Sequence, residues 1–75
     1  MNNQRQRIKQ LFIDRTGEWI PVPEIFRLAA QYNARIYELR AEGMDIENKT
    51  EIRENGVKYS WYCYTSPIKQ MELAL

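Results

Sequence analysis

The chain contains no histidine and only one cysteine, Cys63. A single cysteine excludes a disulfide within the chain. Because disulfides are typical of secreted proteins, we expect a cytoplasmic protein. The same absences exclude the usual zinc sites and the usual pairs of nucleophile and base. No glycine-rich phosphate loop is present, and 75 residues leave little room for a closed pocket. Carboxylate chemistry stays open in principle, but we expect no enzyme, no metal, no cofactor and no small-molecule ligand.

Long apolar runs are also absent from the sequence. No stretch approaches the ~20 residues needed to span a bilayer, and the N-terminal residues MNNQRQRIKQ lack the apolar core of a signal peptide. We therefore expect no membrane partner. The length is that of a single domain, which we expect over residues 1–75, with a core at about 4–65. The tail, residues 66–75, has apolar side chains at the spacing of a short helix.

The first predicted helix covers residues 4–15, QRQRIKQLFIDR. Apolar side chains repeat on one of its faces at helical spacing, and polar side chains take the other faces. The members of the apolar face are Ile8, Leu11 and Phe12. The following residues, GEWIPVPEI, predict a short extended segment at Trp19 and Ile20, because the two prolines disfavour helical backbone in the residues before them.

Residues 23–42 hold the ambiguous part of the helical pattern. Pro23 is suited to open a helix, because its missing N–H is not needed at the first position. No glycine or further proline follows within this range, so periodicity alone allows one helix of about 20 residues. The main apolar stripe contains Ile25, Leu28, Tyr32, Ile36 and Leu39. Phe26 lies off this stripe, and a break near residues 30–31 would let two shorter helices bury both faces. We slightly favour the broken version.

Gly43 is expected to end the last helix, and the chain then continues as a hairpin. Asn55-Gly56 stands between two strand-like segments and favours a two-residue type I′ turn, because both residues tolerate a positive φ. Such a loop places Ile52 opposite Tyr59. The predicted core face carries Ile46, Ile52, Val57, Tyr59, Trp61 and Cys63; the predicted solvent face carries Lys49, Glu51, Arg53, Lys58, Ser60, Tyr62 and Tyr64. A longer loop or a bulge would shift this register.

Residues 32–46, YNARIYELRAEGMDI, resemble the recognition helix of winged helix-turn-helix domains. They are most similar to small phage and prophage proteins that carry an ARIxxLRxxGxxI pattern, and also to the N-terminal DNA-binding domain of the biotin repressor. The resemblance covers roughly residues 8–64. It implies an α+β fold, a small winged helix with a three-helix core and a C-terminal hairpin as the wing, and hence two helices within 23–42. The junction Ala-Ala-Gln-Tyr lacks the glycine of many such turns.

The resemblance implies a DNA-binding protein, a transcriptional regulator of a phage, a prophage or a bacterium. Helix 32–42 is expected to read the major groove, and hairpin 46–64 to contact phosphates of double-stranded DNA. The base-facing candidates are Gln31, Asn33, Ala34 and Tyr37. The phosphate candidates are Arg35, Lys49, Arg53 and Lys58. Solvated surface side chains are the competing interpretation of both sets, and Arg40 is expected to be structural.

The charge distribution argues against strong DNA binding by one copy. Residues 1–17 carry a net charge of +3, residues 18–47 carry −3 and residues 48–75 carry +1, so the predicted helix-turn-helix is acidic. DNA affinity comes largely from neutralised phosphates, and a homodimer or a partner protein would supply more contacts. The alternative is a protein-interaction module on the same scaffold. Its expected interface contains the aromatic pair Tyr62 and Tyr64 of the predicted solvent face.

Overall fold

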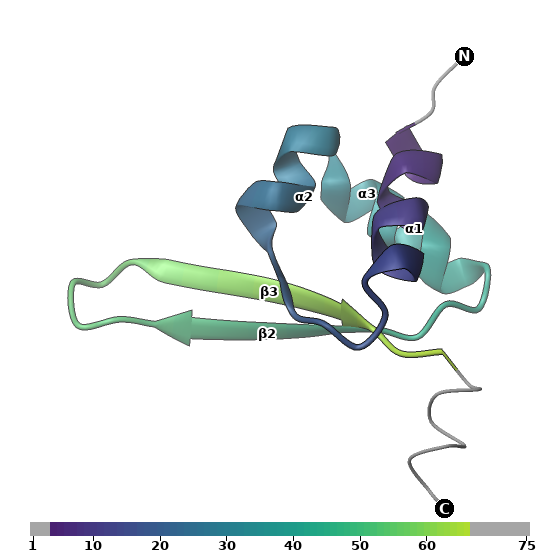
Figure 1. The fold of residues 1–75 in the computed structure, drawn as a ribbon. Coiled ribbons are helices and arrows are strands. Elements are labelled where there is room, and N and C mark those ends of the chain that lie inside the picture. The colour runs from purple at the N-terminus through teal and green to yellow at the C-terminus, as the bar shows by residue number, and fades with distance from the viewer. Residues whose placement is uncertain (1–3, 67–75) are drawn as a thin grey trace, which may run out of the picture.

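A computed structural model describes residues 4–66 of the chain. The elements follow the order α1 (Gln4–Asp14), β1 (Ile20–Pro21), α2 (Val22–Leu28), α3 (Tyr32–Ala41), β2 (Ile46–Ile52) and β3 (Lys58–Tyr64). The strands form one antiparallel sheet in the order β1-β3-β2. The helices lie on one side of the sheet at one end, and the β2–β3 hairpin projects beyond them (Figure 1). This small α+β architecture is compatible with a winged-helix layout.

The expected helix in the tail falls outside the described residues. None of the three described helices is long and apolar enough to cross a membrane.

The core lies between the three helices and the adjacent end of the sheet. Its fully buried side chains are Ile8, Phe12, Ile20, Ile25, Ile36 and Leu39. The apolar stripes predicted for the helices are therefore confirmed. Phe26 is an exception, because we expected its burial and its side chain is 54% exposed. Helix α2 is only 7 residues long, and its inward positions are taken by Ile25 and Leu28, which pack in the core.

The chain forms two helices between Val22 and Ala41, as favoured above. Helix α2 stops at Leu28, and Ala29 takes an extended conformation with φ −160° and ψ 121°. Helix α3 starts at Tyr32, so the break covers residues 29–31. Extended backbone at Ala29 changes the direction of the chain, which brings Ile25 of one helix and Ile36 of the next into one core.

Gly43 ends α3, as predicted, and directs the chain into the sheet. Its φ of +105° is in the left-handed region that favours glycine. The N–H of Gly43 donates a hydrogen bond of 3.0 Å to the carbonyl of Arg40, and the N–H of Met44 donates one of 3.1 Å to the carbonyl of Leu39. These two bonds form a Schellman motif, and Met44 packs against the core as that motif favours. The position of α3 therefore sets the starting point of β2.

The hairpin loop has three residues, so the expected type I′ turn is wrong. The N–H of Arg53 donates a hydrogen bond of 3.0 Å to the carbonyl of Val57, and the N–H of Gly56 donates one of 2.8 Å to the carbonyl of Arg53. Gly56 has φ +79°, whereas Asn55 has no positive φ. This is a type I turn followed by a glycine bulge. Asn-Gly suits this loop too, because only its glycine must be left-handed.

The extra loop residue shifts the pairing by one position and turns β3 over relative to β2. Ile52 pairs with Lys58 instead of Tyr59, and Ile46 pairs with Tyr64. The side of the hairpin that faces the helices, called the inner face, carries Ile46, Asn48, Thr50, Ile52, Lys58, Ser60, Tyr62 and Tyr64. The opposite side, called the outer face, carries Glu47, Lys49, Glu51, Arg53, Tyr59, Trp61 and Cys63.

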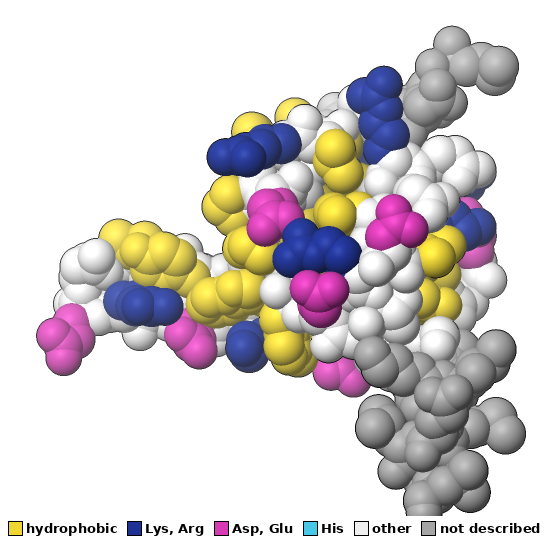
Figure 2. Space-filling model, viewed as in Figure 1, with side chains coloured by type: hydrophobic (Ala, Val, Ile, Leu, Met, Phe, Trp, Pro, Cys, Tyr) yellow, Lys and Arg dark blue, Asp and Glu magenta, His cyan; other side chains and the backbone are white. Residues whose placement is uncertain are grey.

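The two faces predicted from the sequence therefore need correction. Tyr62 and Tyr64, expected on the solvent face, pack against the core, because the inner face is the one that the helices cover. Ile52 and Val57, expected in the core, are 70% and 45% exposed because they lie on the part of the hairpin that projects beyond the helices. Figure 2 shows hydrophobic side chains continuing along this projecting part, beside basic and acidic ones.

Candidate nucleic-acid interface

All four residues predicted to face DNA bases lie on the solvent side of α3 or directly before it. Gln31 occupies the N-cap position, and the side chains of Asn33, Ala34 and Tyr37 are exposed. Tyr37 is 75% exposed, although it follows the buried Ile36 directly. Burial of Ile36 and Leu39 fixes the rotation of α3 about its axis, and this rotation places the four candidates on its free side.

Tyr62 joins the start of α3 to the inner face of the hairpin. Its hydroxyl donates a hydrogen bond of 3.4 Å to Oδ1 of Asn33. Its ring lies edge-on to the ring of Tyr32, with centroids 6.2 Å apart. Burial raises the pKa of Tyr62, and Tyr32 adds to this shift while Arg40 opposes it. The neutral phenol, which can donate to Asn33, is therefore the favoured form.

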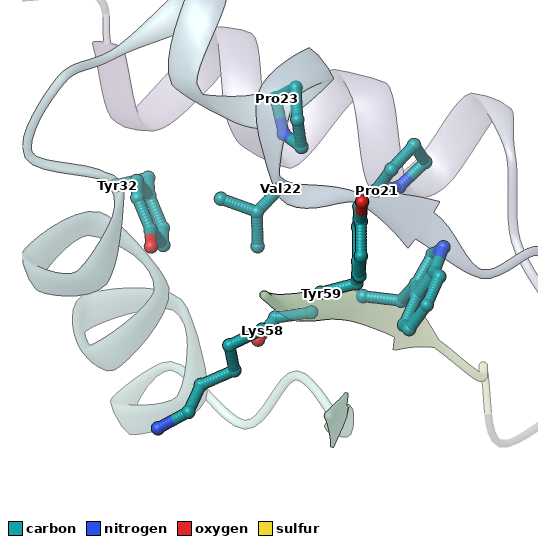
Figure 3. Close-up of a pocket in the computed structure, with 8 residues that line it drawn as sticks. Pro21, Val22, Pro23, Tyr32, Lys58 and Tyr59 are labelled. Atoms are coloured by element: carbon teal, nitrogen blue, oxygen red, sulfur yellow. The ribbon is translucent and has the colours of Figure 1, made fainter. Parts of the chain in front are cut away.

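A cleft of about 400 Å³ lies between the hairpin and the start of the helices. It is lined by Pro21, Val22, Pro23, Tyr32, Lys58, Tyr59, Ser60 and Trp61. Strand β1 has only 2 residues, so the edge of β3 near Ser60 stays uncovered and forms one wall. Figure 3 shows Val22 between Tyr32 and Tyr59, with Lys58 extending toward the side on which α3 lies. The cleft is thus mainly apolar, with one cation at its border.

The hairpin cations do not share one face, so the common solvent face predicted for Lys49, Arg53 and Lys58 is wrong. Only Lys58 lies on the inner face with Tyr62. The Nζ of Lys49 lies 4.8 Å from the ring centre of Trp19 and 5.0 Å from that of Trp61. The guanidinium of Arg53 lies 4.8 Å from the ring centre of Tyr59. Lys49 and Arg53 therefore point away from α3.

Arg35 is paired within α3, and the phosphate role expected for it stays a prediction. Its side chain is 17% exposed, and its Nε lies 2.8 Å from Oε1 of Glu38. This contact is an ion pair without an aligned hydrogen bond, because the buried Nε–H has no acceptor in line. A phosphate contact by Arg35 would therefore have to replace its pairing with Glu38.

Arg40 has the structural role predicted for it. Its Nε and Nη2 donate hydrogen bonds of 3.0 and 2.8 Å to the backbone carbonyl of Ile46. The guanidinium also lies 6.0 Å from the ring centre of Tyr62. One side chain from the end of α3 therefore fixes the start of β2 and contacts the strand beside it.

Several acidic side chains of residues 18–47, the segment with a net charge of −3, are paired with cations of residues 1–17. Glu42 lies 3.4 Å from Arg5 and 3.2 Å from Lys9, both on α1. Arg15 pairs with Glu24 and Glu18, and its pKa is raised, first of all by the hydrogen bond that Glu24 accepts. Exposed pairs such as these add little stability, but they place opposite charges next to each other. The negative charge of this segment is thus partly compensated locally.

Sequence reasoning missed the polar residues that the inner face adds to the site. The hydroxyl oxygens of Thr50 and Ser60 lie 3.0 Å apart across the two strands. Asn48 is on the same face, and its side-chain amide donates a hydrogen bond of 3.1 Å to the backbone carbonyl of Trp61. A three-residue loop, with Gly56 as the bulge residue, would have predicted that Ser60 lies opposite Thr50 on this face.

No protein-family model, no curated protein and no solved structure matches this chain. Residues 4–66 contain no cluster of three or more side chains of the types that hold metal ions. The geometry of α3 and the hairpin is therefore the basis on which a function has to be argued.

Proposed function

We propose that the chain is a DNA-binding protein with a winged helix-turn-helix fold, a transcriptional regulator of a phage, a prophage or a bacterium. Helix α3 enters the major groove, and the inner face of the hairpin lies along the phosphate backbone. The observation that carries this proposal is the contact between Tyr62 and Asn33. It joins the free side of α3 and the inner face of the hairpin into one surface, with Lys58 on it.

The start of α3 offers side chains that match base edges. An asparagine or glutamine amide pairs with adenine through one donor and one acceptor, and an alanine methyl fits a thymine methyl. Gln31 is free for this role, and Ala34 lies one position beyond Asn33 on the same exposed turn. Oδ1 of Asn33 already accepts from Tyr62, but it keeps a second lone pair and a free NH₂ group. Tyr62 thus orients the amide that reads the base.

Phosphate contacts on this surface come from the inner face of the hairpin. Lys58 supplies the charge, and the exposed hydroxyl of Thr50 supplies a neutral donor of the kind that commonly contacts phosphate. Lys58 makes no ion pair within residues 4–66, so no internal contact has to break when it binds. With few charged contacts, one copy binds weakly and the affinity depends on salt.

Two acidic residues near the helix-turn-helix, Glu24 and Glu42, are compatible with α3 lying in the major groove. Glu42 follows the last residue of α3, at the end of the helix opposite to Asn33, and pairs with α1. Glu24 pairs with Arg15 next to the end of α1. Repulsion by these carboxylates is therefore reduced by their partners and falls off over about 8 Å at physiological salt.

The test is binding of the intact chain to random-sequence duplex DNA, measured by fluorescence anisotropy at several salt concentrations. Lys58→Ala and Arg53→Ala are a matched pair, because both remove one hairpin cation but from opposite faces. We expect Lys58→Ala to reduce the slope of log affinity against log salt by about 1. Arg53→Ala should leave the slope unchanged. No binding at low salt, or equal effects of both variants, contradicts the proposal.

A protein-interaction role is the second candidate, and the outer face favours it. Tyr59 on this face is 40% exposed, and Trp19, which contacts Lys49 of the same face, is 38% exposed. The rings of Tyr59 and Trp61 stack with centroids 6.5 Å apart. Exposed aromatic clusters are typical of binding surfaces. Tyr62 and Tyr64, predicted for such an interface, are partly buried and pack against the core. Absence of DNA binding at low salt would favour this second function.

A further inference from the structure

Strand β2 forms one edge of the sheet, and its outer side has no partner strand among residues 4–66. All its residues after Ile46 are exposed. The strand has 7 residues, longer than β1, and it belongs to the hairpin that projects beyond the helices (Figure 1). An exposed edge of this length is a template for pairing with another strand.

The hydrogen bonds within the hairpin show which backbone groups point to this free edge. Thr65 donates from its N–H to the carbonyl of Asp45, and Arg53 donates to the carbonyl of Val57. In an antiparallel pair, alternate residues bond to the partner strand and the residues between them point away. The odd-numbered residues of β2 therefore bond to β3. The N–H and C=O groups of Ile46, Asn48, Thr50 and Ile52 point outward.

The outer-face side chains of β2 alternate in charge along the strand. In chain order they are Glu47, Lys49, Glu51 and Arg53. Two antiparallel copies of this pattern match when Thr50 of one copy lies opposite Thr50 of the other. In that register, Glu47 faces Arg53 of the second copy and Lys49 faces Glu51 of the second copy. Symmetry repeats both pairs, so four pairs of opposite charge lie across the contact.

Neighbouring registers fail on charge or on hydrogen bonding. A shift by two residues in one direction places Lys49 opposite itself, and in the other direction it places Glu51 opposite itself. Like charges directly opposite one another destabilise a strand pair. A shift by one residue sets outward-pointing backbone groups against inward-pointing ones, which removes the ladder. The register centred on Thr50 therefore combines a complete ladder with opposite charges throughout.

We propose that two copies of this chain pair through β2 in antiparallel orientation about a two-fold axis at Thr50, which forms one six-stranded sheet. Ile46 of one copy then lies opposite Glu54 of the other. The two Ile46 residues, at which the strands leave the helical bodies, are then roughly 27 Å apart along the paired strands at 3.4 Å per residue. Each helical body lies toward its own end of the paired strands, because the hairpin projects beyond the helices (Figure 1).

This pairing uses the strand edge, whereas DNA binding uses α3 and the inner face, so the inference does not depend on the proposed function. It doubles the number of Lys58 side chains and α3 helices in one assembly. Contact along a single strand buries less area than the ~1,000 Å² typical of a stable interface. The dimer is therefore expected to depend on concentration, with monomers at high dilution.

The test is sedimentation velocity of the intact chain from low to high micromolar concentration, without DNA. The wild-type chain should shift from monomer to dimer across this range. Lys49→Glu places two like-charged pairs across the axis, and Glu51→Lys does the same, so each should weaken the dimer by about ten-fold. The double variant Lys49→Glu/Glu51→Lys restores opposite charges in both pairs and should recover the dimer.

A backbone variant provides a second measurement. Thr50→Pro removes an N–H that points to the free edge, and proline is tolerated on an edge strand when that N–H faces outward. It should abolish the dimer while the far-UV circular dichroism spectrum stays that of the wild-type chain. A monomer at all concentrations overturns the proposal, as does a dimer that Thr50→Pro leaves intact. A dimer that the double charge variant does not recover overturns this register.

Discussion

Arg40 donates two hydrogen bonds to the backbone carbonyl of Ile46, one of 3.0 Å from Nε and one of 2.8 Å from Nη2. The two residues belong to different elements, since Arg40 is near the end of α3 and Ile46 is the first residue of β2. Between them lies the turn at Gly43. The contact therefore sets the angle between the helix that we propose to read DNA and the hairpin that we propose to contact its backbone.

Arg40→Met tests this contact, because methionine keeps much of the apolar stem and removes both donors. Hydrogen bonds from a charged group contribute about 1.5–3 kcal/mol, so we expect a loss of roughly that size in the free energy of unfolding. Urea denaturation measures it. Arg27→Met is the control, since Arg27 is exposed and makes no ion pair within residues 4–66. Equal stabilities of the two variants would contradict the role of Arg40.

Gly43→Ala tests the left-handed turn after α3. A Cβ at this position meets no atom within 4 Å, so its cost comes from the backbone φ of +105° alone. A left-handed conformation costs a residue with a Cβ about 1–2 kcal/mol. For a domain of this size, each kcal/mol lowers Tm by about 4–8 °C. Gly43→Asn should lose less than Gly43→Ala, because asparagine tolerates this region better. Thermal unfolding followed by circular dichroism compares the three proteins.

The raised pKa of Tyr62 predicts how stability changes at high pH. Burial of the phenol is the main cause, since it disfavours the phenolate in the folded chain. The unfolded chain then loses this proton at lower pH than the folded chain does. The stabilising contribution is complete below about pH 10 and is lost as pH rises through the higher pKa of the folded state.

The free energy of unfolding should therefore decrease more steeply above pH 10 in the wild-type chain than in Tyr62→Phe. Urea denaturation at a series of pH values measures both slopes. Tyr37→Phe is the matched control, because Tyr37 is 75% exposed and removing its hydroxyl changes no buried group. Identical slopes for the wild-type chain and Tyr62→Phe would show that Tyr62 does not control this dependence.

The helices were predictable because their signals are local. The apolar spacing of Ile8 and Phe12, the proline at the start of α2 and the glycine after α3 each act within a few residues. The break between α2 and α3 was less certain, since periodicity allows one long helix across it. Our reason for it was partly wrong: Phe26 is exposed, and it is the change of direction at Ala29 that brings Ile25 and Ile36 together.

The hairpin shows where local reasoning stops. Asn55-Gly56 correctly predicted the turn, but it fits both a two-residue loop and a three-residue loop with a bulge. The choice between them shifts the register by one residue, and this exchanges the faces of every side chain on β3. Lys58 and Tyr62 thereby join the inner face, while Arg53 lies on the outer face with Tyr59.

The sequence by itself determined the order of the elements, the end of α3 and the exposed side of that helix, because short-range backbone preferences and helical periodicity act within a few residues. Only the tertiary structure decided which hairpin face meets the helices, and therefore which cations share a surface with Asn33. The physical reason is that the core needs apolar partners at one end of the sheet. In the observed register, Ile20, Ile46 and the ring of Tyr62 meet that need together.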